Sequence, residues 1–256
     1  MPATPAWPPE SAPRLYVSTP LSEGAAVPVD GNAAHYLLHV MRLKAGDAVL
    51  LFDGTSGEWL ARVEEARKRD ALLLVERRSA APDRVPDFWL CVAPIKKARM
   101  EWLVEKATEL GVGEIHPLLT RRSVVDKVNP DRMTAHMVEA AEQCGRNSLP
   151  IFQEIQQLKA FLQNFPEGRH LFFADENARA QGGAPVAEAV ANHSGPGAFL
   201  IGPEGGFTEE ERDLIRAHPQ TVPVSLGQFI LRAETAAIAA TAVWMAHRAP
   251  EEADSM

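Results

Sequence analysis

The sequence predicts an α/β protein with a parallel sheet, preceded by a smaller all-β domain. Continuous apolar runs such as "FWLCVA" (88–93) and "HLFFA" (170–174) are typical of strands that are buried on both faces. Segments with helical spacing alternate with these runs, which indicates a parallel sheet with crossover helices. Before residue 79, three β-like runs follow one another closely, and this spacing favours a small antiparallel barrel or meander.

The elements of the N-terminal part follow from short β-like runs and the turns between them. A strand is expected to begin at Arg14, and Asp30 is expected to cap a short helix. Three further strands are predicted, "DAVLLF" (47–52), "EWLARVEE" (58–65) and "ALLLVER" (71–77). The stretch "SAAPDRVPD" (79–87) holds two prolines and has no periodicity, so we interpret it as a linker.

The C-terminal part alternates between helices and strands. Apolar residues recur at helical spacing from Met100 to Leu110, and Gly111 follows as a stop signal. Asn129 is predicted to cap a helix that has proline at its first position and reaches about residue 144. Thr208 and Glu211 form a capping-box pattern. The remaining predicted elements are strands at 114–119, 198–201 and 222–226 and a last helix at 233–247.

Composition limits the class of protein. The two cysteines, Cys91 and Cys144, lie far apart, which argues against a disulfide framework or a zinc site and fits a reducing cytoplasm. Residues 1–13 contain five prolines and read as a disordered leader. With this leader and the linker at 79–87, the expected domains are 14–80 and 86–248. The run 236–246 is too short to span a bilayer, so neither a membrane nor a metal partner is predicted.

The charge is unevenly distributed along the chain. The net charge is −8, and residues 151–256 hold 7 of the 26 Lys and Arg but 14 of the 34 Asp and Glu. The first 150 residues are nearly balanced and contain local basic clusters. This distribution allows a phosphate-binding face in the first part of the chain. Ordinary solvated charges explain it equally well.

The stretch "FLIGPEGGF" (199–207) is the first candidate site. It follows a predicted strand and precedes the helix that begins at Thr208, so it lies where open α/β sheets bind ligands. Its glycines allow a ligand to approach the backbone closely. The loop fits neither common phosphate-binding pattern, and it carries the acidic Glu204. It therefore favours a nucleoside without a phosphate chain, and the acidic residue suits a cationic one. A tight turn without a ligand stays open.

The stretch "SLGQFILRAETA" (225–236) repeats this arrangement of strand, glycine, irregular stretch and helix. Two successive loops of this kind would form two walls of one crevice. Ile230 and Leu231 are apolar residues that could cover an adenine face, or pack in the core as such residues more often do.

At these motifs the chain resembles the RsmE family of 16S ribosomal RNA uracil-N3 methyltransferases. "LIGPEGGFTEEE" and "SLGQFILRAETA" carry the resemblance, together with "HYLLHVMRLKAGD" (35–47), "KKARMEWLVEKATELGVGEIHPL" (96–118) and "EAAEQCGRNSLP" (139–150). The resemblance implies a PUA-like β-barrel that binds RNA, then a SPOUT methyltransferase domain with a C-terminal trefoil knot. It also implies a homodimer, S-adenosylmethionine as cofactor, and methylation of N3 of U1498 in the small ribosomal subunit.

The resemblance assigns roles by position. The expected cofactor-binding residues are Leu200, Gly202, Pro203, Gly205, Ser225, Leu226, Gly227, Ile230, Leu231 and Arg232. Glu204 and Arg232 are the candidate catalytic residues, with purely structural roles as the alternative. The candidate RNA contacts are Arg14, Arg42, Lys96, Arg122 and Arg146, each of which could instead be an ordinary ion-pair residue.

Three further residues, Phe229, His35 and His39, are unusual for their positions. The family pattern has an arginine where this chain has Phe229, which could stack on a base or, more commonly for such a residue, pack in the dimer or the core. His35 and His39 have a spacing found in metal sites, but no third ligand lies nearby in sequence, and a packing role is expected.

Two other functions stay open, a non-catalytic RNA-binding module and a methyltransferase for a different RNA site. Nucleotide hydrolysis is disfavoured because no Walker lysine follows the glycine loop.

Overall fold

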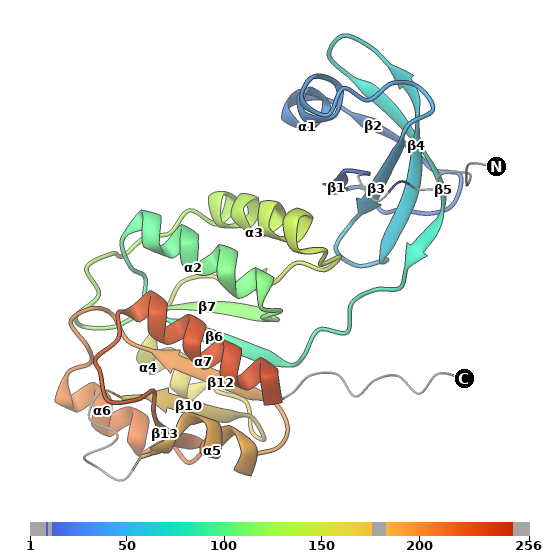
Figure 1. Ribbon diagram of the computed structural model, residues 1–256. Coiled ribbons are helices and arrows are strands. Elements are labelled where there is room, and N and C mark those ends of the chain that lie inside the picture. The colour runs from blue at the N-terminus through green and yellow to red at the C-terminus, as the bar shows by residue number, and fades with distance from the viewer. Residues whose placement is uncertain (1–8, 10–11, 176–182, 248–256) are drawn as a thin grey trace, which may run out of the picture. The chain divides into compact units, whose positions relative to one another are not determined.

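The computed structural model describes residues 9, 12–175 and 183–247 of the chain. Most of the predicted leader, 1–13, lies outside the described residues. The chain divides into two compact units (Figure 1). The first comprises residues 1–83 and 141–149, and the second comprises residues 84–140 and 150–256. The segment 141–149, from the middle of the predicted second domain, therefore belongs to the first unit.

The first unit holds a five-stranded sheet with the strand order β1-β3-β4-β5-β2. Its elements are β1 (Arg14–Tyr16), β2 (Ala26–Val29), α1 (Gly31–His35), the π-helical η1 (Tyr36–Val40), β3 (Ala48–Phe52), β4 (Glu58–Ala66) and β5 (Ala71–Ala80). The pairs β3–β4, β4–β5 and β2–β5 are antiparallel, and β1 pairs with β3 in parallel. Alternating apolar residues of these strands pack with Leu37 of η1 in one core. The antiparallel arrangement of the three predicted runs is confirmed.

Two expectations about the first helix are wrong in detail. Asp30 occupies the N-cap position but makes no side-chain cap hydrogen bond. His35 and His39 do not pack in the core. Both are exposed, and their rings lie against one another with centroids 5.0 Å apart. Among the described residues, no group of three or more His, Cys, Asp or Glu side chains is placed to hold a metal ion.

The second unit is built on parallel strands, as predicted. Its strands are β6 (Phe88–Val92), β7 (Glu114–Leu119), β8 (Ile151–Phe152), β9 (Gln156–Gln157), β10 (His170–Ala174), β11 (Ala184–Pro185), β12 (Gly197–Ile201) and β13 (Thr221–Ser225). The order is β11-β13-β10-β12-β6-β7-β8, and β9 also pairs with β7. The helices are α2 (Lys97–Glu109), α3 (Pro130–Cys144), α4 (Leu158–Gln163), α5 (Val186–Asn192), α6 (Glu209–Arg216) and α7 (Ala233–His247). Residues 141–144 of α3 belong to the first unit.

Helices cover both faces of this sheet. On one face, α4 and α6 pack against alternate strand residues, including Leu171, Phe173 and Leu200. On the other face lies α7, whose Trp244 stacks on Phe88 with ring centroids 4.5 Å apart. In Figure 1, α7 runs across this face. Burial on both sides explains why the strands read as continuous apolar runs. No helix in the described part of the chain is long and apolar enough to cross a membrane.

His116 of β7 lies in an aromatic cluster and should make folding sensitive to acid. Its ring lies 4.3 Å from that of Trp89, and its Nε2 is 3.1 Å from Glu114 Oε2. Burial lowers the pKa of His116 to about 4, an effect that Glu114 opposes and Arg169 reinforces. The folded pKa is thus below the unfolded value, so the stabilising contribution is present above about pH 6.5 and is lost as the pH falls towards 4.

Between pH 7 and pH 5, this residue alone should reduce the free energy of unfolding by about 2 kcal/mol. Urea denaturation of the wild type and of His116→Phe at both pH values measures the difference, with the transition of the second unit analysed separately from that of the first. The variant should lose about that much less stability on acidification. An equal loss in both proteins would show that His116 does not titrate in this range.

Candidate active site

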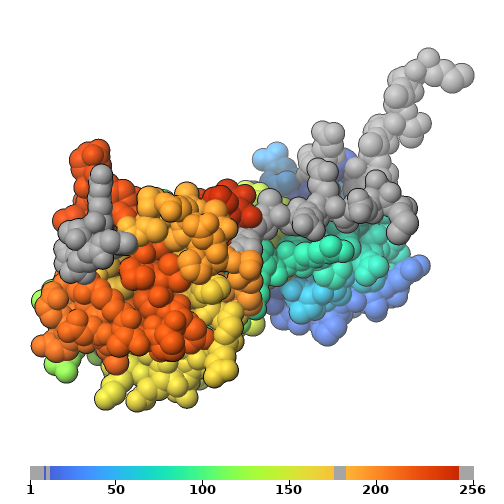
Figure 2. Space-filling model, turned by 90° about the horizontal axis from the view of Figure 1, so that it is seen from below, coloured from blue at the N-terminus to red at the C-terminus, as the bar shows by residue number. Residues whose placement is uncertain are grey.

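The candidate site lies at the carboxyl ends of two strands that flank β10. β12 and β13 both run parallel to β10, so their ends meet at one edge of the sheet. The first loop, 202–208, follows β12, and the second, 226–232, follows β13 and leads into α7. The segment from the first loop to the start of α7 appears in orange shades on the surface in Figure 2. The two loops predicted to form one crevice therefore do lie together.

The first loop folds back onto its own phenylalanine. A Cβ added at Gly202 would lie 2.7 Å from Cε2 of Phe207, whose ring is buried. Phe207 in turn packs edge-on against Phe173, with centroids 5.3 Å apart. A turn hydrogen bond of 2.9 Å from the Gly206 N–H to the Pro203 carbonyl closes the bend. Gly202 is therefore required because the backbone passes too close to an aromatic ring for any side chain.

The helix after this loop begins as predicted. The Thr208 hydroxyl accepts a hydrogen bond from the Glu211 N–H, and Glu211 Oε2 accepts one from the Thr208 N–H. The other carboxylate oxygen of Glu211 accepts from the Arg121 N–H at 2.8 Å. The capping box is thus confirmed, and it also ties the segment after β7 to the loop.

A cleft opens between the two loops. Seven of the predicted cofactor residues line it, namely Gly202, Pro203, Ser225, Leu226, Gly227, Ile230 and Leu231. Its other lining residues are Ala174, Asp175, Ile201, Glu204, Gly206, Phe207, Arg212, Val224, Gln228, Phe229, Ala233 and Ala236. A Cβ added at Gly227, which has a φ of +125°, would meet no atom within 4 Å. The second loop thus presents bare backbone to open space.

Three predicted cofactor residues lie outside the lining. Leu200 is fully buried in the core. Gly205 packs against Arg122, whose Nη1 donates to the Gly205 carbonyl at 2.8 Å. Arg232 is exposed, and within the described part of the chain its guanidinium has no recorded ion pair. The nearby Glu234 lies 3.6 Å from Arg99.

Glu204 lines the cleft and is partly neutralised. Its Oε1 lies 3.4 Å from Arg99 Nη1, and about a third of its side chain is exposed. Arg99, from the first turn of α2, also approaches Glu234 at the start of α7. Glu234 is buried and does not line the cleft, so Glu204 is the carboxylate at the rim. A cationic ligand suits this balance better than a polyphosphate does.

Sequence reasoning missed a buried ion cluster in the cleft. Asp175, with a side chain that is 1% exposed, lies 3.5 Å from Arg212 Nε and also pairs with Arg216. A signal was available, because Asp175 directly follows the apolar run of β10 and so lies at the carboxyl end of a buried strand. The arginines on α6 neutralise this carboxylate and fix the floor of the cleft.

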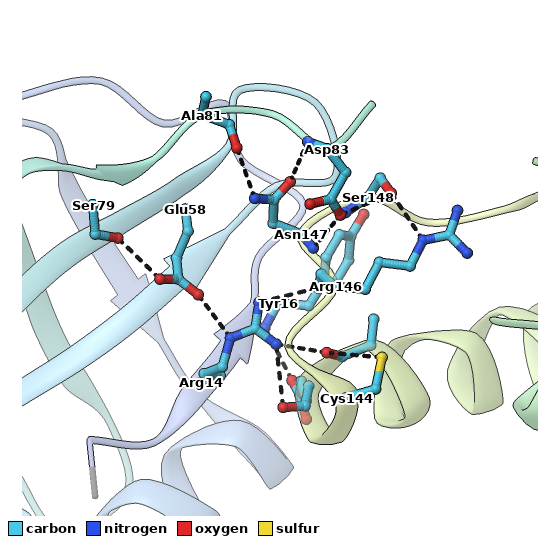
Figure 3. A network of polar contacts seen from close by, with 12 residues as sticks. Arg14, Tyr16, Glu58, Ser79, Ala81, Asp83, Cys144, Arg146, Asn147 and Ser148 are labelled. Atoms are coloured by element: carbon cyan, nitrogen blue, oxygen red, sulfur yellow. Dashed lines mark hydrogen bonds and ion pairs between the residues drawn. The ribbon is translucent and has the colours of Figure 1, made fainter. Parts of the chain in front are cut away.

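Two of the predicted RNA contacts, Arg14 and Arg146, serve the first unit itself (Figure 3). Arg14 Nε pairs with Glu58 at 2.7 Å, and its two terminal nitrogens donate to the carbonyls of Ala141, Glu142 and Arg146. Arg146 is 9% exposed, and its Nε donates to the Ser148 hydroxyl at 2.8 Å. Burial lowers the pKa of Arg146. Both guanidiniums are thus engaged in holding segment 141–149.

Asp83 completes the attachment of this segment. Its carboxylate accepts from the N–H groups of Asn147 and Ser148, at 2.6 and 3.0 Å, and from the Ser148 hydroxyl. The Asn147 side chain forms two further hydrogen bonds: its Oδ1 accepts from the Asp83 N–H, and its Nδ2 donates to the Ala81 carbonyl. Figure 3 shows these bonds alongside those of Arg14. The remaining predicted RNA contacts, Arg42, Lys96 and Arg122, are exposed.

Comparisons with known proteins give matches over most of the chain. A family described as an RNA methyltransferase domain matches residues 82–245, and an RNA methyltransferase PUA domain matches residues 29–76. The ribosomal RNA small subunit methyltransferase E of Rickettsia conorii is 32% identical over 90% of this chain and 93% of its own length. That of Bacillus subtilis is 27% identical over 84% and 88%.

Two solved structures of similar fold also match most of this chain. The ribosomal RNA small subunit methyltransferase E of Neisseria gonorrhoeae, bound to S-adenosylmethionine, superposes with a TM-score of 0.80 and 28% identity. The match covers 92% of this chain and 97% of that one. A Legionella pneumophila protein in complex with the same cofactor gives a TM-score of 0.79 at 29% identity.

Proposed function

Because the chain belongs to the ribosomal RNA small subunit methyltransferase E family, we propose that it methylates N3 of a uridine, U1498, in 16S ribosomal RNA. The methyl donor is S-adenosylmethionine. The observation that supports this most strongly is the cleft between the loops after β12 and β13, in a chain that matches a cofactor-bound relative over 92% of its length. The intact cleft favours an enzyme over a non-catalytic RNA-binding module.

The cleft fits this cofactor in its chemistry. Backbone groups around Gly202 and Gly227 offer hydrogen bonds to an adenosyl group without interference from side chains. Ile230 and Leu231 supply apolar surface, and Glu204 favours a positively charged ligand. When bound, S-adenosylmethionine supplies an electrophilic methyl group. We assign the cofactor role to the seven predicted residues that line the cleft.

The chain's own contribution to the reaction is placement and control of charge. Methylation at N3 would remove the ring proton and form an N–CH₃ bond while the S–CH₃ bond of the donor breaks and a neutral thioether leaves. The nucleotide must therefore be held in line and its developing negative charge stabilised. Glu204 at the rim is our candidate to accept the proton. Arg232 is our candidate to stabilise the anion, since its guanidinium is exposed at the end of the second loop. Single-turnover rates of Glu204→Gln and Arg232→Gln at saturating cofactor test these roles, and unchanged rates would remove them.

The proposed partner is a second copy of the chain, and the proposal is based on exposed apolar side chains at the cleft. Phe229 and Ile230, at the cleft, are 76% and 83% exposed in the single chain. We assign this apolar surface to the interface of a homodimer. Sedimentation equilibrium of the wild type and of Phe229→Asp tests this, and a wild type that is monomeric at micromolar concentration contradicts it.

The proposed location is the cytoplasm, where the free thiols of Cys91 and Cys144 would stay reduced.

The fold proposal includes a trefoil knot in the second unit. An experimental structure traced through residues 170–247 tests it, because a chain that threads no loop would contradict it.

Mass spectrometry of 16S RNA from a strain that lacks this protein tests the proposed function. One methyl-uridine should disappear and return when the gene is restored. An unchanged methylation pattern would exclude the proposed target.

A further inference from the structure

Arg99 lies at the same edge of the sheet as the cleft. It belongs to the first turn of α2, the helix that follows β6. Just past the end of β6, the Ala93 N–H donates to the carbonyl of Ile201, the last residue before the first loop, at 3.1 Å. The helix α2 also packs against α7 (Figure 1). Arg99 therefore lies near both loops, although 105 positions separate it from Glu204.

The Arg99 guanidinium contacts a carboxylate from each wall of the cleft. Its Nη1 donates to Glu204 Oε1 in the first loop at 3.4 Å, and its Nε lies 3.6 Å from Glu234 Oε1 at the start of α7. Glu204 lines the cleft, as do Ala233 and Ala236, the neighbours of Glu234 in α7. Arg99 is absent from the lining. One side chain thus connects the first loop with the end of the second loop from outside the cleft.

The burial of Glu234 makes this connection more than a surface ion pair. The Glu234 side chain is 11% exposed, compared with 31% for that of Glu204. Its Oε2 is buried and has no hydrogen-bond partner among the described residues, and Arg99 is the one cation recorded beside it there. A buried carboxylate that loses its counter-ion is strongly destabilising. The first turn of α7 therefore depends on Arg99.

We propose that Arg99 is a positioning residue that holds the two walls of the cleft at the separation that binds S-adenosylmethionine, an inference that rests on the proposed function and extends it. Arg99 acts through Glu204 on the first loop, and through Glu234 on Ala233 and Ala236. Walls that are ordered before the ligand arrives increase its affinity, because binding then removes less conformational entropy.

The direction of the effect separates positioning from simple charge. S-adenosylmethionine carries a sulfonium cation, and S-adenosylhomocysteine carries a neutral thioether in its place. If Arg99 acted only through its charge, its removal would strengthen binding of the cationic ligand, because like charges repel. Loss of positioning instead weakens binding of both ligands, since they share the adenosyl group that the walls hold. S-adenosylhomocysteine should lose at least as much affinity as S-adenosylmethionine.

Titration calorimetry of both ligands tests the proposal. Arg99→Gln should bind each of them about tenfold more weakly than the wild type does. Arg99→Lys should lie between the two, because one ammonium group cannot replace two separate guanidinium nitrogens. Lys106→Gln is the matched control, since Lys106 also lies on α2 and pairs with two carboxylates, Glu105 and Glu109, none of which lines the cleft. It should bind both ligands like the wild type.

A double variant identifies the route of the effect. Glu234→Gln removes the buried charge that Arg99 neutralises. Arg99→Gln combined with Glu234→Gln should therefore bind the cofactor more tightly than Arg99→Gln alone.

Hydrogen exchange of the ligand-free protein gives an independent readout. Peptides covering 202–208 and 226–236 should exchange faster in Arg99→Gln, whereas peptides from β6 and β10 should exchange as in the wild type. Faster exchange throughout the second unit would show a general structural role and overturn the inference.

Two binding results would also overturn it. One is wild-type affinity of Arg99→Gln for both ligands, or tighter binding of S-adenosylmethionine alone. The other is a double variant that binds no better than Arg99→Gln. These measurements need no RNA, so they are separable from the proposed function. A wild type that binds the cofactor and methylates no RNA overturns only that function, and a wild type that binds no cofactor overturns both.

Discussion

Gly202→Ala is expected to weaken S-adenosylmethionine binding at least tenfold. The new Cβ would lie 2.7 Å from Cε2 and 3.0 Å from Cδ2 of Phe207. The ring is 3% exposed and packs against Phe173, so it cannot move aside without disturbing the core. Overpacking of this kind costs about 1–3 kcal/mol, and the loop can relieve it only by shifting into the cleft. Since about 1.4 kcal/mol is a factor of ten in affinity, titration calorimetry will detect the change.

Gly205→Ala in the same loop is the matched control. A Cβ at Gly205 would meet Arg122 Cβ at 3.4 Å, which is an ordinary contact, and the residue is absent from the cleft lining. This variant should bind the cofactor within about threefold of the wild type, a change of less than 1 kcal/mol. Equal weakening by both substitutions would show that the loop is generally sensitive, and wild-type affinity of Gly202→Ala would show that the loop does not contact the cofactor.

Arg14→Ala is expected to lower the stability of the first unit by about 3 kcal/mol. The substitution removes the ion pair with Glu58, whose side chain is 15% exposed, and leaves three carbonyls of segment 141–149 without their donor. Removing one partner of a largely buried pair typically costs about 3–5 kcal/mol, and the remaining exposure places this case at the lower end. Because a chain with two compact units need not unfold in one step, hydrogen exchange is the appropriate measurement. Peptides from β1, β3 and 141–149 should exchange faster.

Arg67→Ala serves as the control for this prediction. Arg67 also forms two ion pairs, but its side chain is 66% exposed, so its loss should change stability by less than about 1 kcal/mol. Unchanged exchange in Arg14→Ala, together with weakened RNA binding, would return Arg14 to the RNA-contacting residues predicted from the sequence.

The sequence predicted the elements whose signals are local. The strands at 114–119 and 170–174 and the helix at 233–247 have the predicted bounds, because long apolar runs and clear periodicity define them. The Asn129 cap is also confirmed, since its side chain accepts from the Arg132 N–H. The two-residue strands β8, β9 and β11 were not predicted, because two residues are too few to show alternation.

The sequence could not predict contacts between distant residues. Arg14 and the carbonyl of Ala141 are separated by 127 positions, so nothing near Arg14 indicates that its charge is internally satisfied. The positive φ of Arg42, just after η1, was equally invisible, because glycine is the residue expected at such helix ends. The clash that requires Gly202 depends on a ring five residues away that approaches only after the loop has folded. Local pattern thus predicted where the cleft is, and tertiary contacts determine which residues face it.

Transfer of a labelled methyl group tests the central claim most directly. Purified protein would be incubated with unmethylated small ribosomal subunits and S-adenosylmethionine that carries a deuterated methyl group, and the RNA would be digested and analysed by mass spectrometry. The proposed function predicts one labelled N3-methyluridine per 16S molecule, and labelling that is several-fold slower with Gly202→Ala under limiting cofactor. Label on a different base, or unlabelled RNA from a protein that binds the cofactor, would contradict the account.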